Sequence, residues 1–371
     1  MNKKRRFAAT PFARVVAPRK KVPAQKPISL NVLFGLPDDR RATIKVEAGG
    51  RRLDYDLPGT ADIVHHLPPE RFSAEWVYLG PGQEQPAKLR PGALLNHIGD
   101  ADICSQALEL ARRLVSKSGR ACFNHPDAIA GTTRERVARV LAGIAGLDVP
   151  KTIRTAALTP ADLRAVVKRE GLEYPLLIRV VGHHGGTNMV KVDRPDDDDE
   201  VDRLDRSARS ELYVTEFRNV IGSDRLYRKF RIVVVGNDIL MRHMITAENW
   251  LVHASHLLEA RTRKTANTKE VEFEMFAAFD NEHGKRLLPI FQEIGRRLDL
   301  DYVGVDCAIV ESGEVVLFEA NACMTILGQT QTELNPKAVA INRIREAVAN
   351  LLAAPSAWRH ARPRTDSASA T

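Results

Sequence analysis

The chain has 371 residues, of which 44% are hydrophobic and 27% are charged, a composition typical of globular proteins with room for two or three domains. No apolar stretch is long enough to span a membrane and no signal-peptide pattern is present, which argues against membrane-spanning and secreted classes. Four cysteines without C-x-x-C spacing indicate reduced thiols, so we expect a cytoplasmic protein.

The formal net charge of +8 comes from one end of the chain. Residues 1–27 carry nine Lys and Arg and no acid, so subtracting +9 from +8 leaves −1 for the rest. This segment predicts a disordered basic tail, which could bind a weak anionic partner such as nucleic acid, the ribosome or a membrane surface. A solubilising extension with no partner is an equally open interpretation. Residues 355–371, rich in Ser, Ala and Arg, predict a second flexible tail.

Residues 28–127 predict a small α/β domain with a mostly parallel sheet. Short apolar runs bounded by turns indicate strands, and one amphipathic segment with helical spacing indicates a helix at 101–116. The strands are expected at 30–35, 61–67, 75–80, 93–99 and 120–124.

The next segments alternate helix and strand signals. A helix is predicted to begin near Thr132, where Thr132-x-x-Glu135 fits a capping box. A second begins at Pro160 after Thr159 and ends at Gly171. Further strands are expected at 175–181, 188–192, 212–217 and 230–235, and further helices near 287–298 and 335–352.

Two apolar runs near the carboxyl end, 301–310 and 314–321, predict a β-hairpin around Ser312 and Gly313. If the turn centres on those two residues, paired residues have numbers that sum to 625, and Asp306 lies opposite Glu319. Asn321 points to the same face as Glu319 because side chains alternate along a strand. Two opposed carboxylates need a compensating cation.

That cation could be a divalent metal or a basic side chain. Two carboxylates and an amide oxygen are hard ligands of the kind that bind Mg²⁺ or Mn²⁺ together with water and nucleotide phosphates. An Arg or Lys that neutralises the pair without any metal explains these residues equally well.

Three arginines and a glycine-rich loop are candidate phosphate-binding groups. Arg179 and Arg231 each lie within an apolar strand, where a guanidinium requires an anionic partner, either a phosphate or a nearby acid. Gly185 and Gly186 belong to a loop (182–188) that lets backbone N–H groups approach phosphate oxygens, although most such loops are ordinary turns. Arg136 lies in the first turn of the helix predicted near Thr132. We expect the histidines of this loop to be polar loop residues and not ligands. His243 could line the substrate side or be structural, and we assign it no role.

The order of these parts resembles the ATP-grasp superfamily, which includes D-alanine–D-alanine ligase, glutathione synthetase and RimK-type peptide ligases. The resemblance covers roughly 93–352. It includes the segment FNHPDAIAGTTRERVARVLAGIAGLDVPKT (123–152), the strand TEF (215–217), the Arg-bearing strand and the final D…E-x-N pattern. It is similar to uncharacterised bacterial ATP-grasp domains, some found with tetratricopeptide repeats.

The resemblance implies an α/β (α+β) fold class, with an ATP-grasp fold preceded by a small pre-ATP-grasp domain at 28–127. The ATP-grasp part would span 128–354, with a nucleotide-lid half at 128–215 and a metal-binding half at 216–354. Asp306, Glu319 and Asn321 would hold the Mg²⁺ or Mn²⁺ that bridges the ATP phosphates. The other implied site residues are the phosphate cations Arg136 and Arg179, the loop glycines Gly185 and Gly186, the adenine-facing hinge Thr215, Glu216 and Phe217, and the catalytic Arg231.

The resemblance also implies an ATP-dependent carboxylate–amine (or thiol) ligase that acts through an acyl phosphate on a peptide or small metabolite. The alternatives are an ATP-grasp phosphotransferase and a non-catalytic nucleotide-binding protein.

Overall fold

The computed structural model describes residues 26–46, 53–83, 88–156, 159–207, 210–252, 274–279, 281, 284–328 and 336–361. The predicted basic tail lies almost wholly outside these ranges, as do residues 362–371 of the predicted second tail. The prediction of a flexible tail is wrong for 355–361. Trp358 is buried there and donates from Nε1 to the carbonyl of Leu351, and Arg359 Nε donates to the carbonyl of Leu300.

The N-terminal region contains a four-stranded sheet in which every strand pair is parallel, as the sequence predicts. Helix α1 (Ser105–Ser118) packs against this sheet, followed by the short α2 (Pro126–Ala130). A separate two-stranded hairpin was not predicted; it pairs β2 (Thr43–Val46) with β3 (Leu53–Asp56). The order in the parallel sheet is β4 (Phe72–Leu79), β1 (Ile28–Gly35), β5 (Ala93–Asn96), β6 (Cys122–Phe123).

The strand predicted at 61–67 is wrong, because this segment forms a short 3₁₀ helix, η1 (Val64–His66). Its backbone donors are used by one buried histidine instead of a neighbouring strand. The N–H groups of Ile63 and Val64 both donate to His97 Nε2, at 3.1 Å each. The preceding Asp62 accepts from three backbone N–H groups of residues 326–328, which ties this segment to the chain that follows the C-terminal hairpin.

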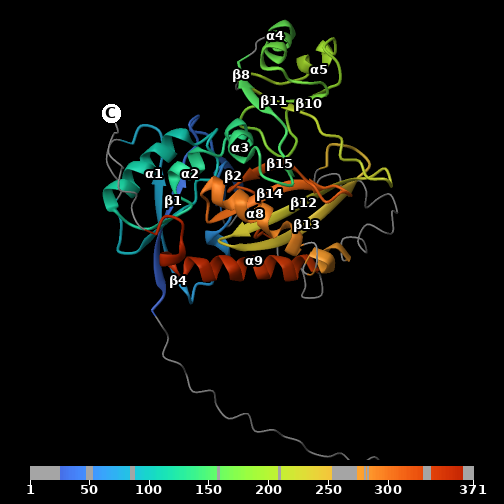
Figure 1. The fold of residues 1–371 in the computed structure, drawn as a ribbon. Helices are drawn as coiled ribbons and strands as arrows, with labels where there is room; N and C mark the ends of the chain where they lie inside the picture. The colour runs from blue at the N-terminus through green and yellow to red at the C-terminus, as the bar shows by residue number, and fades with distance from the viewer. Residues whose placement is uncertain are drawn as a thin grey trace, which may run out of the picture.

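A second sheet forms a lid that stands above the rest of the molecule in Figure 1. Its strands are all antiparallel neighbours, and α4 (Pro160–Glu170) and α5 (Asp198–Asp202) belong to the same unit. As predicted, α4 begins at Pro160 and ends at Gly171. Thr159 caps it in a capping box, and Gly171 takes the left-handed conformation. The strand order is β10 (Met189–Val192), β9 (Leu176–Val180), β11 (Leu212–Glu216), β8 (Thr152–Thr155).

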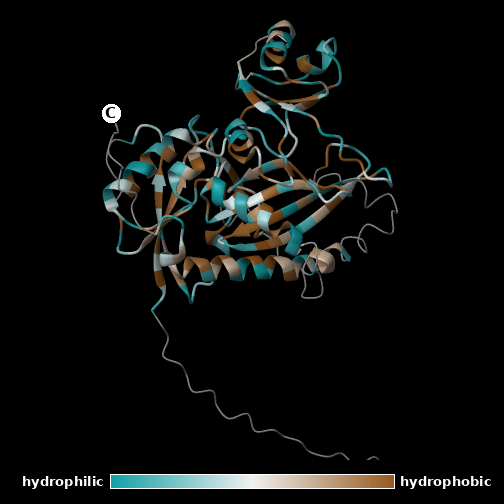
Figure 2. Cartoon of the chain, viewed as in Figure 1, coloured by the Kyte–Doolittle hydropathy of each residue, from teal (hydrophilic) through white to brown (hydrophobic). Residues whose placement is uncertain are grey.

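The third sheet carries the C-terminal hairpin. Helix α8 (Gly284–Leu298) packs on one face, and the long α9 (Pro336–Leu352) crosses the other, as Figure 1 shows. Figure 2 shows apolar residues along the strands between these helices. The strand order is β13 (Asp238–Ala247), β12 (Tyr227–Val235), β14 (Tyr302–Ile309), β15 (Val315–Asn321), β7 (Leu147–Asp148).

Helix α3 (Arg134–Leu141) begins two residues later than predicted, and the predicted capping box does not form. Thr132 lies in the preceding turn, where its hydroxyl donates to the carbonyl of Ile129. Thr133 is the N-cap residue, and its hydroxyl donates to Glu135. This start sets which side chains of the first turn face the hairpin sheet.

Three hydrophobic cores hold the described residues together. Two of them combine the N-terminal sheet with the hairpin sheet, one on the α8 side and one on the α9 side. The third lies within the lid, from Leu163 to Val214. The predicted boundary at residue 127 therefore divides segments that share buried cores, and the domain limits stay a prediction. None of the described helices has the length and apolarity needed to cross a membrane.

Candidate active site

The register of the hairpin places Asp306 directly opposite Glu319, as predicted, although the turn differs from the prediction. The loop has three residues, 311–313, and Gly313 closes it at φ 87°, a conformation that favours glycine. Near the turn the pairing is therefore shifted by one residue. A β-bulge at Phe318 then adds one residue to β15, and this restores the expected pairing at Asp306.

A polar row crosses four strands of the sheet at this level. Glu319 on β15 pairs with Asp306 on β14, Asp306 with Arg231 on β12, and Arg231 with His243 on β13. Directly paired residues project to the same face of a sheet, so these four side chains form one line. Cys307, the next residue of β14, faces the α8 core on the other side of the sheet.

Asp306 is neutralised by two cations of its own sheet. Arg231 donates to both carboxylate oxygens, at 2.7 and 2.9 Å, and Lys229 Nζ lies 3.1 Å from Oδ2. Burial alone would lower the pKa of Arg231, but the charge of Asp306 raises it. Basic side chains therefore neutralise Asp306 in this structure. This arrangement is the metal-free alternative that the sequence left open.

Glu319 is neutralised by groups from other parts of the chain. Arg134 at the start of α3 donates to Oε1 at 2.6 Å, and His184 Nδ1 from the glycine-rich loop lies 3.4 Å from the same atom. Burial would raise the pKa of Glu319, but Arg134 and His184 hold it well below its usual value. Asn321 Nδ2 also donates to this oxygen, at 2.7 Å.

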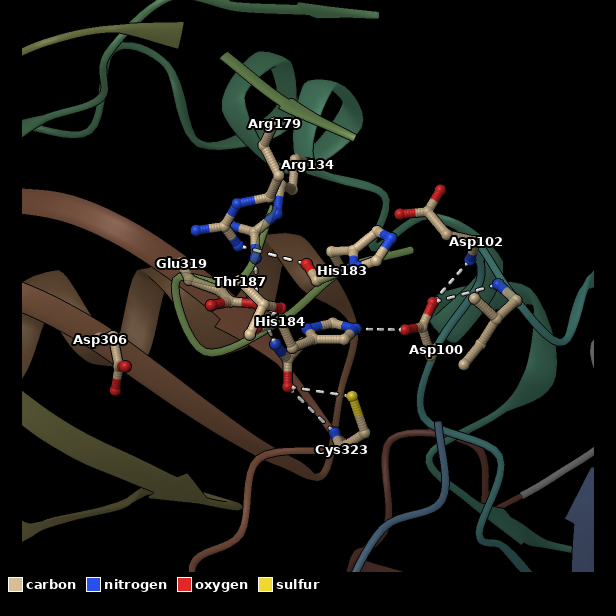
Figure 3. Close-up of polar contacts among 12 residues, drawn as sticks. Asp100, Asp102, Arg134, Arg179, His183, His184, Thr187, Asp306, Glu319 and Cys323 are labelled. Carbon is tan, nitrogen blue, oxygen red and sulfur yellow. Dashed lines mark hydrogen bonds and ion pairs between the residues drawn. The ribbon is translucent and has the colours of Figure 1, made fainter. Parts of the chain in front are cut away.

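His184 connects the lid to the N-terminal region. Its Nε2 lies 2.5 Å from Asp100 Oδ2, so the ring bridges Asp100 and Glu319, as Figure 3 shows. Burial lowers its pKa, but hydrogen bonds to both carboxylates outweigh that and raise it to about 9. The close packing of Gly99, where a Cβ would lie 2.7 Å from Cys323 Cβ, brings Asp100 to this position. Potential ligand atoms of Asp100, His184 and Cys323 all lie within 4.8 Å of one another.

Arg179 points into the same space from β9, beside Arg134 in Figure 3. The contacts of its guanidinium in the described residues are to neutral atoms, the carbonyl of His183 at 3.4 Å and Met189 Sδ at 2.9 Å. Burial, followed by repulsion from Arg134, lowers its pKa to about 9, and the attraction of Glu319 offsets only part of this effect. The site therefore holds a guanidinium in need of an anion.

Among the described residues that meet at Asp306 and Glu319, cations outnumber carboxylates. The carboxylates are Asp100, Asp306 and Glu319, while Asp102, which also lines the cavity, pairs with Arg154. The cations that lie against or between them are Arg134, Arg179, His184, Lys229 and Arg231.

Arg136 does not reach this site, which corrects the predicted phosphate contact. Its side chain is 55% exposed, and Nη1 donates to the carbonyl of Ala130. Two residues on a helix are separated by about 200°, so Arg134 faces the hairpin while Arg136 faces away. Arg134 takes the place that the resemblance assigned to Arg136.

The predicted hinge residues border the site with their backbone already engaged. Thr215 lines the cavity beside Glu319, and its hydroxyl lies 3.1 Å from that of Thr152. The N–H groups of Glu216 and Phe217 donate to the carbonyls of Lys151 and Pro175. An adenine edge would therefore have to use other groups of this segment or replace these bonds.

The loop glycines lie on the β9–β10 turn, and both have positive φ, 65° for Gly185 and 79° for Gly186. The antiparallel pairing of Arg179 with Met189 confirms the predicted hairpin. The loop therefore brings His184 down onto Glu319. A phosphate-binding role for its glycines stays a prediction.

The residues of the polar row fit a metal in part. Asp306 and Glu319 are adjacent carboxylates on a rigid hairpin, which suits Mg²⁺. Asn321 turns its amide nitrogen to Glu319, while its oxygen accepts from the N–H of Cys323 at 3.1 Å. Metal ligation by Asn321 would need its amide to rotate. The five cations fit the phosphates of a nucleotide.

A cavity of about 60 Å³ lies between the three sheets. It brings together Glu319 and Asn321, the basic residues Arg134 and His184, and Asp100 of the N-terminal region. Small-molecule pockets usually occupy about 300–1,000 Å³, so this cavity holds a few waters and not a nucleotide. Binding of ATP would require the lid to move outward.

Sequence reasoning missed Asp100, Arg134 and His184. Arg134 could have been predicted, because it is a basic residue in the first turn of α3 just as Arg136 is. The evidence for His184 was weaker, namely its position in the loop that follows Arg179. Nothing in the sequence indicated Asp100, because it lies 84 residues from His184.

The chain has an ATP-grasp fold, as the resemblance implied. Two solved structures support this: the D-Ala:D-Ser ligase VanG of Enterococcus faecalis, with a TM-score of 0.53, and the D-alanine–D-alanine ligase of Coxiella burnetii, with 0.51. The first is 13% identical, with 88% of this chain and 100% of that chain covered; the second is 12% identical, with 90% and 96% covered. No family model and no curated protein matches the sequence.

Proposed function

We propose that the protein is an ATP- and Mg²⁺-dependent ligase that joins a carboxylate to an amine or a thiol. The observation that carries this proposal is the surplus of cations around the Asp306–Glu319 pair in the described part of the chain, and above all the half-buried Arg179, whose guanidinium contacts only neutral atoms among the described residues. A triphosphate supplies the missing negative charge, and a divalent ion supplies the positive charge that the carboxylates need once the arginines turn to phosphate. The two structures with similar folds are both ligases by name.

The residues divide into three groups in this proposal. Asp306 and Glu319, with Asn321 after rotation of its amide, would hold the Mg²⁺, which when bound neutralises phosphate charge. Arg134, Arg179 and His184 would bind the phosphates from the lid side. The segment Thr215–Phe217 would border the base.

Arg231 and Lys229 would then face the transferred phosphoryl group. In the first step an oxygen of the substrate carboxylate attacks the γ-phosphorus, the bond to the β–γ bridging oxygen breaks, and ADP leaves. In the second step an amine attacks the acyl carbon, which releases phosphate and one proton. This chain orients the groups and stabilises negative charge as it develops on the phosphoryl oxygens.

The test is nucleotide product analysis on the full chain with Mg²⁺, a panel of carboxylic acids and hydroxylamine as a general nucleophile. A ligase forms ADP, phosphate and a hydroxamate only when an acid is present. Asp306→Asn should reduce this turnover at least about a hundredfold, the size typical of losing a transition-state charge contact. Arg136→Ala, outside the site, is the matched control.

Other product patterns would overturn the proposal in distinct ways. ADP without free phosphate, together with a stable phosphorylated product, would identify a phosphotransferase. ATP binding without any turnover across the panel would identify a nucleotide-binding protein. Full turnover in both Asp306→Asn and Glu319→Gln would reject the metal assignment.

A further inference from the structure

Asp100, His184 and Cys323 bring three different kinds of metal ligand together. One oxygen of Asp100, one ring nitrogen of His184 and the sulfur of Cys323 all lie within 4.8 Å of one another. Figure 3 shows the sulfur of Cys323 directed towards the contact between the other two side chains. Ligand atoms that bind a tetrahedral ion at about 2.0–2.3 Å lie roughly 3.4 Å apart, so small rotations of these side chains would let them surround one.

The groups behind these ligands are arranged as a metal site requires. Asp100 Oδ1 accepts from the backbone N–H groups of Asp102 at 2.7 Å and Ile103 at 3.3 Å. Its Oδ2 lies 2.5 Å from His184 Nε2, and His184 Nδ1 lies 3.4 Å from Glu319 Oε1. A histidine that binds a metal through one ring nitrogen usually donates from the other to a carboxylate, which fixes the ring. Glu319 therefore supports His184 as a ligand through Nε2.

The cavity beside the cluster supplies a fourth ligand. Asp100, His184 and Cys323 all line the cavity of about 60 Å³, which holds a few waters. Three protein ligands and one water complete a tetrahedral shell. A sulfur and an imidazole nitrogen favour zinc over Mg²⁺ or Ca²⁺, which prefer oxygen ligands.

The charges of the cluster match a divalent ion. The carboxylate of Asp100 and the thiolate of Cys323 balance its two positive charges, and His184 binds as the neutral imidazole. Binding releases two protons, one from the thiol and one that His184 holds against Asp100. Burial raises the pKa of the Cys323 thiol, but a metal ion bound to the sulfur reverses this by stabilising the thiolate.

We propose that Asp100, His184 and Cys323 bind one Zn²⁺ ion, with a water as the fourth ligand, while the lid lies against the N-terminal region. The ligands come from three parts of the chain. Asp100 lies between β5 and α1, His184 in the β9–β10 loop of the lid, and Cys323 after β15. The ion therefore links the lid to both other sheets. The Mg²⁺ of the proposed function would bind elsewhere, at Asp306 and Glu319.

Zinc holds the lid closed. Its bonds replace a hydrogen bond between His184 and Asp100, and a zinc ion with three protein ligands binds much more strongly than one hydrogen bond. Because ATP needs the lid to move outward, bound zinc excludes the nucleotide. This last consequence rests on the proposed function, whereas the metal site and the closed lid do not.

The test is titration of the full chain with Co²⁺ as an absorbing substitute for Zn²⁺, without nucleotide and with a reductant that lacks thiols. One equivalent should produce thiolate-to-cobalt charge-transfer absorption and the visible bands of a tetrahedral ion, and Zn²⁺ should remove both. Hydrogen exchange in β9 and β10 is then measured with Zn²⁺. It should slow about tenfold when free Zn²⁺ is roughly ten times its Kd, because the ion binds the closed lid only.

Variants locate the ion. Cys323→Ala should abolish the charge-transfer absorption and weaken Zn²⁺ binding at least about a hundredfold, because even the hydrogen-bond partners of metal ligands contribute about 10- to 100-fold. Cys122→Ala removes a buried cysteine of the parallel sheet and should behave as the wild type. Asp100→Asn retains the Oδ1 acceptor and should lose affinity as Cys323→Ala does, which covers the case that the cysteine variant does not fold.

The absence of a tetrahedral Co²⁺ spectrum in the wild type would overturn the proposal. Charge-transfer absorption that persists in Cys323→Ala would do so too, because the ion would then lie at another cysteine. Exchange in β9 and β10 that Zn²⁺ leaves unchanged would refute the closed lid. None of these measurements uses ATP, so a failure of the proposed function, seen by product analysis without zinc, is distinguished from a failure of this inference.

Discussion

Asp306 and Glu319 face each other across one hairpin, yet their cationic partners come from different regions. Lys229 and Arg231 lie on β12, the hydrogen-bonded neighbour of β14, so the Asp306 end is formed within one sheet. The partners of Glu319 come from α3 and from the lid loop. The Asp306 end is therefore fixed by the fold, and the Glu319 end is completed only when the lid lies against it.

The cores support the same distinction. The hairpin sheet shares two buried cores with the N-terminal sheet, whereas the lid is packed around a core of its own. Polar contacts attach the lid to the N-terminal region: His184 to Asp100, and Tyr213 and Arg154 to Asp102. Such contacts break at lower cost than a hydrophobic core, so the lid is the part that can open for a nucleotide.

The largest expected effect is that of Glu319→Gln on the lid. Without this carboxylate, Arg134 and Arg179 repel each other, and removing one partner of a largely buried ion pair costs about 3 kcal/mol. Hydrogen exchange should accelerate in β9 and β10. Asp306→Asn is the matched control, because its partners lie within the hairpin sheet and the lid amides should keep their protection. Equal acceleration of exchange in the two variants would contradict the inference that Glu319, and not Asp306, holds the lid in place.

Arg134 and Arg136 form a second matched pair. Arg134→Ala should weaken ATP binding about 10- to 100-fold, because a hydrogen bond between charged groups contributes roughly 1.5–3 kcal/mol. Arg136→Ala should change it less than twofold, since its side chain is directed away from the cavity. The measurement is the Kd of ATP in the presence of Mg²⁺. A larger loss of ATP affinity in Arg136→Ala than in Arg134→Ala would support the phosphate contact that was predicted for Arg136.

The variant Tyr213→Phe tests whether polar contacts attach the lid to the N-terminal region. Its hydroxyl lies 2.8 and 2.9 Å from the two carboxylate oxygens of Asp102, in a buried setting. Tyr213→Phe should destabilise the closed lid by about 1–2 kcal/mol. Limited proteolysis should then cut within the lid faster than in the wild type. Tyr227→Phe removes an exposed hydroxyl contact to Asn219 and should leave the rate unchanged.

The smallest expected effect is a dependence on pH. The pKa of His184 is raised from 6.5 to about 9 in the folded chain. Its proton-linked stabilisation is therefore fully present below pH 6.5 and is lost as pH rises towards 9. The loss should be roughly 1 kcal/mol, as expected for a partly exposed ion pair. The melting temperature should fall over this range in the wild type and less in His184→Gln; parallel curves would refute the contact.

Local patterns predicted the parts of the fold that depend on neighbours in sequence. The parallel sheet, the capped α4 and the pairing of Asp306 with Glu319 followed from apolar runs and turn residues, although the last relied on a bulge that offset an error in the turn. The strand predicted at 61–67 does not form, because His97 accepts hydrogen bonds from backbone N–H groups of this segment. Helix α3 begins at Arg134 instead of near Thr132, and Arg134 contacts Glu319 where the resemblance had indicated Arg136. Asp100 and His184 meet only in the folded chain.

The central claim is that the cations now paired with Asp306 and Glu319 exchange those carboxylates for a triphosphate, while Mg²⁺ takes their place. A crystal structure with an ATP analogue and Mg²⁺ tests it most directly. We predict metal density between the two carboxylates, with Arg231, Arg134 and Arg179 on phosphate oxygens. Unchanged contacts from Arg231 to Asp306 and from Arg134 to Glu319, with density for neither nucleotide nor metal, would contradict it.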